Sequence, residues 1–326
     1  MKPITRIGAG ALVCAVLAFA QQAAGADANG YPGAKPIAMT VLFPAGSSAD
    51  VTARILAEGM SQRLGTQIVI VNRPGGGGAV GYKYVAAQAP DGYHLVWNSN
   101  SISTTYYTGA SNIDYKAFDG VARVLVETPL LVVRSDARWK SLRDMVAEAK
   151  RQPGKITVGN SGSGSHTHFA AVALFRVAGV QMLDVPFGAA QVVTGLLGGH
   201  VDSAVQLPGA VVPHVKNGSL RVLAALSGSR DPAFPDVPTA AEEGVNARAE
   251  AWRGVAVPKG TSKAVIAKLE DAIRKTVESP RFHQAAERLS VAPAFLPATE
   301  FDRLTAQEDR EVQKIVTALG LKQAAK

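Results

Sequence analysis

Short apolar runs alternate with amphipathic segments along most of the chain, and this alternation restricts the fold more than any other feature. Residues Asp50–Leu64 carry Leu56, Met60 and Leu64 at helical spacing between two apolar runs. Strands and helices in such alternation predict an α/β fold. We expect the strands Ile37–Phe43, Thr66–Val71, His94–Trp97, Leu130–Arg134, Lys155–Val158, Asp184–Phe187 and Arg221–Leu226, and the further helices Ser141–Lys150, Val192–Leu197, Ser262–Glu278 and Glu300–Leu319.

Two junctions in this pattern share one design, in which a strand runs through a glycine and serine loop into a helix. The first is Thr40–Leu56 (TVLFPAGSSADVTARIL) and the second is Val158–Phe175 (VGNSGSGSHTHFAAVALF). A helix that begins in such a loop offers free N–H groups at the positive end of its dipole, where anions bind. Alternatively, Ser48 or Asp50 only caps its own helix. Two copies in different halves of the chain favour one carboxylate held between two domains.

The N-terminus has the features of a cleaved secretory signal. Lys2 and Arg6 precede the apolar run Ile7–Ala20, and Ala24–Ala26 supplies the small residues of a cleavage site. Cys14 is the only cysteine and lies inside this segment, so we expect neither disulfides nor a thiol nucleophile in the mature chain. The formal charge of +8 either serves solubility alone or, outside the cytoplasm, favours an anionic ligand over nucleic acid.

Two motifs point to cofactor or metal sites that the rest of the sequence does not support. Residues 76–81 fit G-x-G-x-x-G after a strand, but the next strand ends at Trp97 without an acid for a ribose hydroxyl. His166 and His168 offer two zinc ligands, but no further ligand lies near them at a suitable spacing. We therefore expect neither a cofactor nor a metal.

A serine nucleophile is the remaining catalytic possibility. None of Ser161, Ser163 and Ser165 has glycine on both sides in the pattern G-x-S-x-G. The sequence therefore predicts that the protein is not an enzyme.

Seven segments in order resemble the substrate-binding receptors of tripartite tricarboxylate transporters, often called the Bug family. Each segment alone is a weak match, but together they cover nearly the whole mature chain. They read FPAGSSADVTARILAEGMSQRLG, VNRPGGGGAVG, PDGYHLV, GNSGSGSHTHF, VPFGAA, LLGGHVD and FPDVPTAAEEG.

The resemblance implies a type II periplasmic binding fold, in which two α/β lobes are joined by two crossover strands and close over a ligand. We expect the crossovers near Val126–Leu130 and Ala249–Val255. Residues 1–26 are then the signal peptide, residues 27–127 and 253–326 the first lobe, and residues 128–252 the second. Such a receptor is a periplasmic monomer that binds a small organic carboxylate, carries out no chemistry and delivers its ligand to the membrane permease subunits of a tripartite transporter.

The resemblance also implies which residues face the ligand, because the two loops described above form the pocket in such receptors. The loop residues that carry over are Phe43, Ala45, Gly46, Ser47, Ser48, Asp50, Ser99, Ser101, Gly162, Ser163, Gly164, Ser165, His166, Thr167 and His168. To these we add the positions in and beside the segments that depart from the family pattern: Phe187, Gly188, Ala189, Gln206, Trp252 and Arg253.

Three departures from the family pattern fall in this predicted pocket. Phe187 stands where such receptors usually have tyrosine followed by lysine, and Gln206 stands where they often have an Asp-Asn pair. Arg253 follows the hinge residue Trp252, where an apolar or aromatic residue is usual. One acid fewer and one cation more favour an anionic ligand, with Arg253 binding a second acidic group. The alternative is a solvated Arg253 beside the hinge.

The sequence is compatible with more than one ligand and more than one role. Phe43, Trp97 and Trp252 are either ring-stacking residues for an aromatic carboxylate or core residues, so aliphatic di- and tricarboxylates are equally acceptable. A ligand-binding partner of a sensor system with the same fold and a secreted enzyme are the alternative functions.

Overall fold

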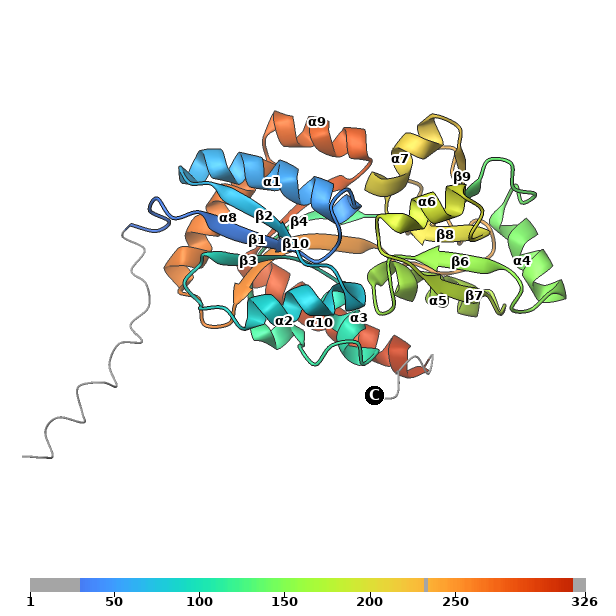
Figure 1. Cartoon of the computed structure of the whole chain (residues 1–326), viewed down its shortest axis with the longest axis horizontal. Coiled ribbons are helices and arrows are strands. Elements are labelled where there is room, and N and C mark those ends of the chain that lie inside the picture. Colours follow the sequence, from blue (N-terminus) through green and yellow to red (C-terminus); the bar gives the residue numbers. More distant parts are fainter. Residues whose placement is uncertain (1–29, 232–233, 319–326) are drawn as a thin grey trace, which may run out of the picture.

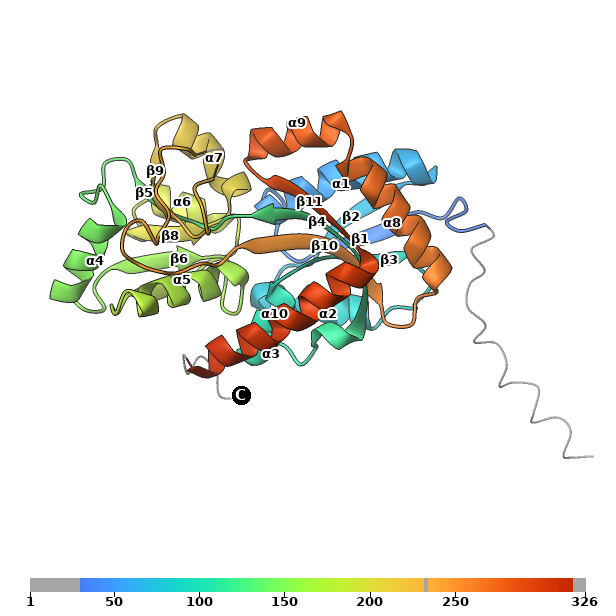
Figure 2. The same cartoon turned by 180° about the vertical axis from the view of Figure 1, so that it is seen from behind.

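Two α/β lobes lie side by side in the computed structural model, which describes residues 30–231 and 234–318 (Figure 1). The predicted signal peptide, residues 1–26, lies outside the described residues. Each lobe contains one twisted sheet with helices on both faces, and the second view shows the same division from behind (Figure 2). The predicted α/β fold with two lobes is therefore confirmed.

The first sheet has the strand order β11-β4-β10-β3-β1-β2. Strand β1 pairs in parallel with β2 and β3, whereas β10 pairs in antiparallel fashion with β3 and β4. Central parallel strands are covered on both faces, which explains why the sequence of β1 is almost continuously apolar. The strands are β1 (Ile37–Val41), β2 (Ile68–Asn72), β3 (His94–Ser99), β4 (Phe118–Glu127), β10 (Ala251–Pro258) and β11 (Ala292–Pro297).

The second sheet has the strand order β7-β6-β8-β5-β9. Alternate side chains of β5 enter two different apolar clusters, as expected for successive residues of a strand. Leu131 and Val133 pack in the cluster that contains α4 (Leu142–Arg151) and α5 (His166–Val177). Leu130 and Val132 pack in the cluster that contains α6 (Gln191–Leu197) and α7 (Pro208–Lys216). The strands are β5 (Leu130–Arg134), β6 (Thr157–Asn160), β7 (Leu183–Pro186), β8 (Ser203–Gln206) and β9 (Leu220–Ala225).

The chain passes between the lobes twice. It leaves the first sheet after Glu127 and enters the second at Leu130, and it returns through residues 226–250 to β10. The C-terminal helices then pack on the first lobe, where α8 (Lys263–Val277) contacts α1 (Ser48–Leu64) and α10 (Ala298–Ala318) contacts β4. We propose the lobe limits stated above on the basis of this strand division, although β10 begins at Ala251, before the predicted limit at Arg253.

The local sequence determines where helix α1, which follows the first loop, begins and ends. Ser47 caps α1 by accepting a hydrogen bond from the N–H of Asp50, and Gly65 ends the helix with a left-handed φ of 66°. Among the described residues, no helix has the length and apolarity needed to cross a membrane. The helices are α1 (Ser48–Leu64), α2 (Ala79–Ala86), α3 (Ser101–Tyr107), α4 (Leu142–Arg151), α5 (His166–Val177), α6 (Gln191–Leu197), α7 (Pro208–Lys216), α8 (Lys263–Val277), α9 (Pro280–Leu289) and α10 (Ala298–Ala318), with short 3-10 turns at Gly76–Gly78 and Tyr115–Ala117.

A largely buried carboxylate attaches α10 to the second crossover. Glu308 accepts hydrogen bonds from the indole N–H of Trp252 in β10 and from Nδ2 of Asn100, at 2.7 Å. Burial raises the pKa of Glu308 to about 7, and these two hydrogen bonds oppose that rise only in part. The folded protein therefore holds this proton more tightly than the unfolded chain does.

We expect Glu308 to make the stability of the protein depend on pH. Its contribution is complete below the unfolded pKa of about 4.5 and is lost as the pH rises through about 7. Glu308→Gln keeps an acceptor for Trp252 and Asn100 but has no charge, so the variant should gain stability relative to the natural chain between pH 5 and pH 8. Urea denaturation should show a difference on the order of 1 kcal/mol or more. Parallel pH profiles of the two proteins would contradict this assignment.

Candidate functional site

A small cavity of about 20 Å³ lies between the two lobes, where the two predicted loops meet. The first turns of α1 and α5 border it from opposite lobes, and Ser101 of α3 and Arg253 of β10 complete its wall. Its full lining is Phe43, Ser47, Ser48, Ala49, Ser101, Ser161, Ser165, His166, Thr167, Ala189, Gln206, Leu207 and Arg253.

The structure brings together about half of the predicted site residues around this cavity. Those that line it are Phe43, Ser47, Ser48, Ser101, Ser165, His166, Thr167, Ala189, Gln206 and Arg253. Those that lie outside its lining are Ala45, Gly46, Asp50, Ser99, Gly162, Ser163, Gly164, His168, Phe187, Gly188 and Trp252. Ala49, Ser161 and Leu207 also line the cavity, although they are not among the predicted site residues.

The first loop uses most of its polar groups to hold its own shape. The N–H of Gly46 donates to Asp50 at 3.0 Å, and the hydroxyl of Ser47 donates to the carbonyl of Pro44 at 2.7 Å. Burial raises the pKa of Asp50, but hydrogen bonds from Arg54, Gly46 and Asn72 outweigh it and hold the pKa below its usual value. Asp50 is therefore an ionised residue that braces the loop.

The second loop is braced in the same way. The N–H of Gly162 donates to Asn160 at 3.0 Å, and that of Gly164 donates to Nδ1 of His168 at 3.1 Å. The N–H of Ser161 donates to the hydroxyl of Thr167 at 2.9 Å. Gly46, Gly162 and Gly164 therefore supply turns rather than free donors.

The backbone N–H groups that remain free lie directly after the two loops, in the first turns of α1 and α5. Across the described part of the chain, the N–H groups of Ser48, Ala49 and Thr167 have no hydrogen-bond partner. All three residues line the cavity. The N-terminal ends of α1 and α5 thus direct free N–H donors toward one space, which suits a carboxylate.

Arg253 forms a buried ion pair within the site. Its Nε donates to Glu127 at 2.9 Å, and the two side chains are 5% and 0% exposed. Glu127 also accepts a hydrogen bond from the hydroxyl of Ser48. The alternative that Arg253 is a solvated side chain is therefore wrong. No hydrogen bond joins its terminal nitrogens to any described residue, so they remain as donors beside the cavity.

The other polar side chains of the site are largely engaged within the protein. Gln206 donates to the hydroxyl of Ser161 at 3.2 Å and to the carbonyl of Ala189 at 3.3 Å, and it accepts from the N–H of Leu207 at 2.9 Å. Gln206 therefore fixes three segments of the second lobe around the cavity and offers little to a ligand.

The three aromatic residues that the sequence offers for ring stacking lie in different surroundings. Trp97 is fully buried in the core of the first lobe, and Trp252 packs edge-on against Phe301 with the ring centres 4.9 Å apart. Phe43 lines the cavity, and the guanidinium of Arg253 lies 5.7 Å from its ring centre. Of the three, only Phe43 is placed to touch a ligand.

The lobes meet closely at the cavity. Thr104 of the first lobe donates to the carbonyl of Gly164 at 2.8 Å, and the N–H of His166 donates to Ser101 at 3.3 Å. A cavity of about 20 Å³ has room for about one water molecule. Any organic carboxylate is larger, so its entry requires the two loops to move apart.

The glycine-rich segment after β2 takes part in this contact between lobes. A methyl group on Gly77 would lie 2.6 Å from the backbone nitrogen of Ser165 and 2.7 Å from the carbonyl oxygen of Ser163. Gly77 also has a left-handed φ of 67°. In this structure the G-x-G-x-x-G motif therefore allows two backbone segments from different lobes to approach closely.

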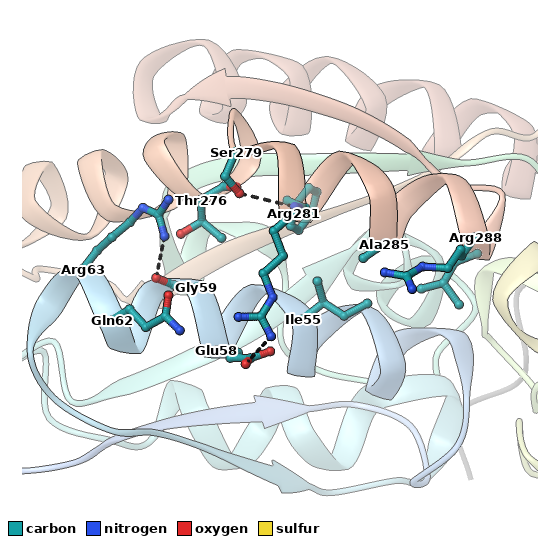
Figure 3. Close-up of a pocket in the computed structure, with 12 residues that line it drawn as sticks. Ile55, Glu58, Gly59, Gln62, Arg63, Thr276, Ser279, Arg281, Ala285 and Arg288 are labelled. Atoms are coloured by element: carbon teal, nitrogen blue, oxygen red, sulfur yellow. Dashed lines mark hydrogen bonds and ion pairs between the residues drawn. The ribbon is translucent and has the colours of Figure 1, made fainter.

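A larger groove on the first lobe, of about 440 Å³, lies between α1 and α9 (Figure 3). It contains three arginines, but Arg281 pairs with Glu58 at 2.6 Å, Arg63 donates to the carbonyl of Gly59 at 3.0 Å, and Arg288 donates to the carbonyl of Gln284 at 3.2 Å. The groove touches one lobe only. Each of these arginines has a partner within the same lobe, and the groove brings together no groups from the second lobe, so the cavity between the lobes is the better carboxylate site.

Comparison with known proteins finds, along most of the chain, the receptor family that the sequence resembles. Residues 52–321 match the model of the tripartite tricarboxylate transporter family receptor. Protein BugT of Bordetella pertussis is 33% identical over 320 residues, which cover 96% of this chain and 97% of that protein.

Two solved structures show the same arrangement of lobes. The periplasmic binding protein BugD is 27% identical, covers 90% of this chain and 100% of its own, and superposes with a TM-score of 0.85. MatC from Rhodopseudomonas palustris with bound malate is 26% identical, covers 88% and 100% of the two chains, and has a TM-score of 0.81. The chain therefore belongs to the tripartite tricarboxylate transporter receptor family, the family of the Bug proteins.

Proposed function

We propose that this protein is a periplasmic receptor, exported by its N-terminal signal, that captures a small organic carboxylate between its lobes. The monomer then presents the ligand to the permease subunits of a tripartite transporter and carries out no catalysis. Membership of the receptor family supports this role, as does the malate bound by the related MatC.

The observation that carries the proposal is the convergence of donors from both lobes on one cavity. Ser48 and Ala49 offer backbone N–H groups from the first lobe, Thr167 offers one from the second, and Arg253 adds a guanidinium at the crossover. A charge-assisted hydrogen bond contributes about 1.5–3 kcal/mol, so four such donors can supply the roughly 8 kcal/mol of micromolar binding.

A thermal-shift screen of the mature chain tests this function. The panel contains aliphatic and aromatic mono-, di- and tricarboxylates, each beside the amide of the same carbon skeleton. We expect at least one carboxylate to stabilise the protein by about 2.7 kcal/mol at 100 times its Kd, and its amide to have no effect. Stabilisation by amides and carboxylates alike, or by no member of the panel, would contradict the carboxylate assignment.

Two further observations on the best ligand separate this role from the alternatives. A receptor returns its ligand unchanged after prolonged incubation, whereas an enzyme converts it, and mass spectrometry distinguishes the two. Deletion of the gene should abolish uptake of that carboxylate, whereas a sensor partner would leave uptake by its transporter intact. Gel filtration of the saturated protein should give the size of one chain.

A further inference from the structure

His166 is the one histidine in the lining of the cavity between the lobes. It is the first residue of α5 and is only 7% exposed. Its Nε2 lies 2.8 Å from the carbonyl oxygen of Ala249 in the second crossover. A carbonyl oxygen can only accept a hydrogen bond, so Nε2 must carry a proton.

The protonation of the other ring nitrogen, Nδ1, follows from the charge of the ring. Burial lowers the pKa of His166 to about 4, and the positive charge of Arg253 lowers it as well, although the hydrogen bond to Ala249 acts in the opposite direction. The ring is therefore neutral near pH 7, with its single proton on Nε2. Nδ1 is left as a hydrogen-bond acceptor.

This acceptor has no donor within the described residues, although it is buried. Buried polar atoms in native proteins almost always have a partner, so an unsatisfied one in a cavity wall requires an explanation. Among the described residues, no hydroxyl of the cavity lining is placed to donate to Nδ1.

A carboxylate alone cannot satisfy this set of groups. The N–H groups of Ser48, Ala49 and Thr167 and the terminal nitrogens of Arg253 all donate, which suits the oxygens of a carboxylate. Nδ1 of His166 accepts, and an ionised carboxylate has no proton to give it. A ligand with acceptor oxygens and, beside them, one donor satisfies the whole set without a bridging water.

We infer that the ligand is a hydroxycarboxylate, whose hydroxyl group donates a hydrogen bond to Nδ1 of His166 while its carboxylate is held by the helix ends and Arg253. This inference rests on the proposed receptor function and narrows its ligand class. His166 is then a specificity-determining residue, because a ligand without the hydroxyl leaves a buried acceptor unpaired.

Calorimetric titration with matched pairs of ligands tests the inference. The pairs are malate and succinate, 2-hydroxyglutarate and glutarate, and mandelate and phenylacetate, which differ only in the hydroxyl. In each pair that binds, we expect the natural chain to prefer the hydroxy acid by about tenfold or more. In His166→Phe this preference should fall to about one, whatever the general loss of affinity from the missing Ala249 hydrogen bond.

His168→Phe is the matched control, because His168 lies in the same helical turn outside the cavity lining, and its Nδ1 already accepts from Gly164. This variant should lower the affinity for both members of a pair equally and keep the preference. Equal affinities in the natural chain, or a preference that survives in His166→Phe, would overturn the inference and leave the receptor function intact. If none of the six acids and no member of the wider carboxylate panel binds, the receptor function itself fails.

Discussion

Gly77→Ala is expected to weaken carboxylate binding by roughly 100-fold, or about 2.7 kcal/mol, without preventing folding. The added methyl group would overlap the backbone of Ser163 and Ser165, which cannot turn aside as a flexible side chain can. Separation of the lobes relieves this overlap, but it also draws the helix end at Thr167 away from the helix end at Ser48. Calorimetry with the best carboxylate from the screen measures the effect.

Gly76→Ala provides the matched control for this substitution. Gly76 has a similar left-handed φ of 55°, but a methyl group there would meet only Ala79 of its own lobe, at 3.2 Å. Both variants should therefore lose about 1–2 kcal/mol of stability from backbone strain, while only Gly77→Ala should lose affinity. Affinities of the two variants within about threefold of each other would show that the Gly77 contact does not control closure.

Arg253→Ala is expected to lower the free energy of unfolding by about 3–5 kcal/mol, because it leaves the carboxylate of Glu127 buried without its cation. Replacing both partners, as Arg253→Met with Glu127→Leu, should restore most of this stability, since two apolar side chains of similar size carry no desolvation cost. Urea denaturation of the single and double variants gives the comparison.

The double variant also separates stability from binding. It removes the guanidinium from the cavity, so it should fold stably and still bind carboxylates weakly. A double variant as unstable as Arg253→Ala would show that the ion pair stabilises the fold beyond compensating its own burial. A stable double variant with unchanged affinity would place Arg253 outside the ligand contacts.

The regular elements of the fold were predictable because their sequence patterns are local. The strand Leu130–Arg134 was predicted with its observed bounds, and the helix from Ser141 begins with Ser141 as its cap. The elements not predicted include short ones such as α3, whose sequence SISTTYY lacks an apolar stripe, and longer ones such as β4 and α9. Strand β11 was missed as well, because its pairing with β4 depends on tertiary packing.

The candidate site was predictable only at the level of its two loops. The helix starts at Ser48 and His166 follow from the glycine and serine pattern, but which N–H groups remain free depends on side chains such as Asp50 and His168 that occupy the others. Hydrogen bonds of this kind cannot be read from spacing.

Glu127 is the charged residue of the site that the sequence did not predict. It ends the apolar strand β4, and its partner Arg253 lies far along the chain in β10. An acidic residue at the end of an apolar crossover strand was the available signal, because a buried carboxylate requires a cation or several donors. The same reasoning would have placed Arg253 opposite Glu127 rather than in solvent.

Hydrogen–deuterium exchange of the mature chain, with and without the best carboxylate, tests the central claim most directly. If the ligand is held between the lobes, exchange should slow in both Phe43–Asp50 and Gly162–His168 at saturation, while the groove between α1 and α9 should be unchanged. Protection confined to one lobe, or centred on Arg63 and Arg281 in that groove, would contradict the claim that this protein captures its ligand between two helix ends.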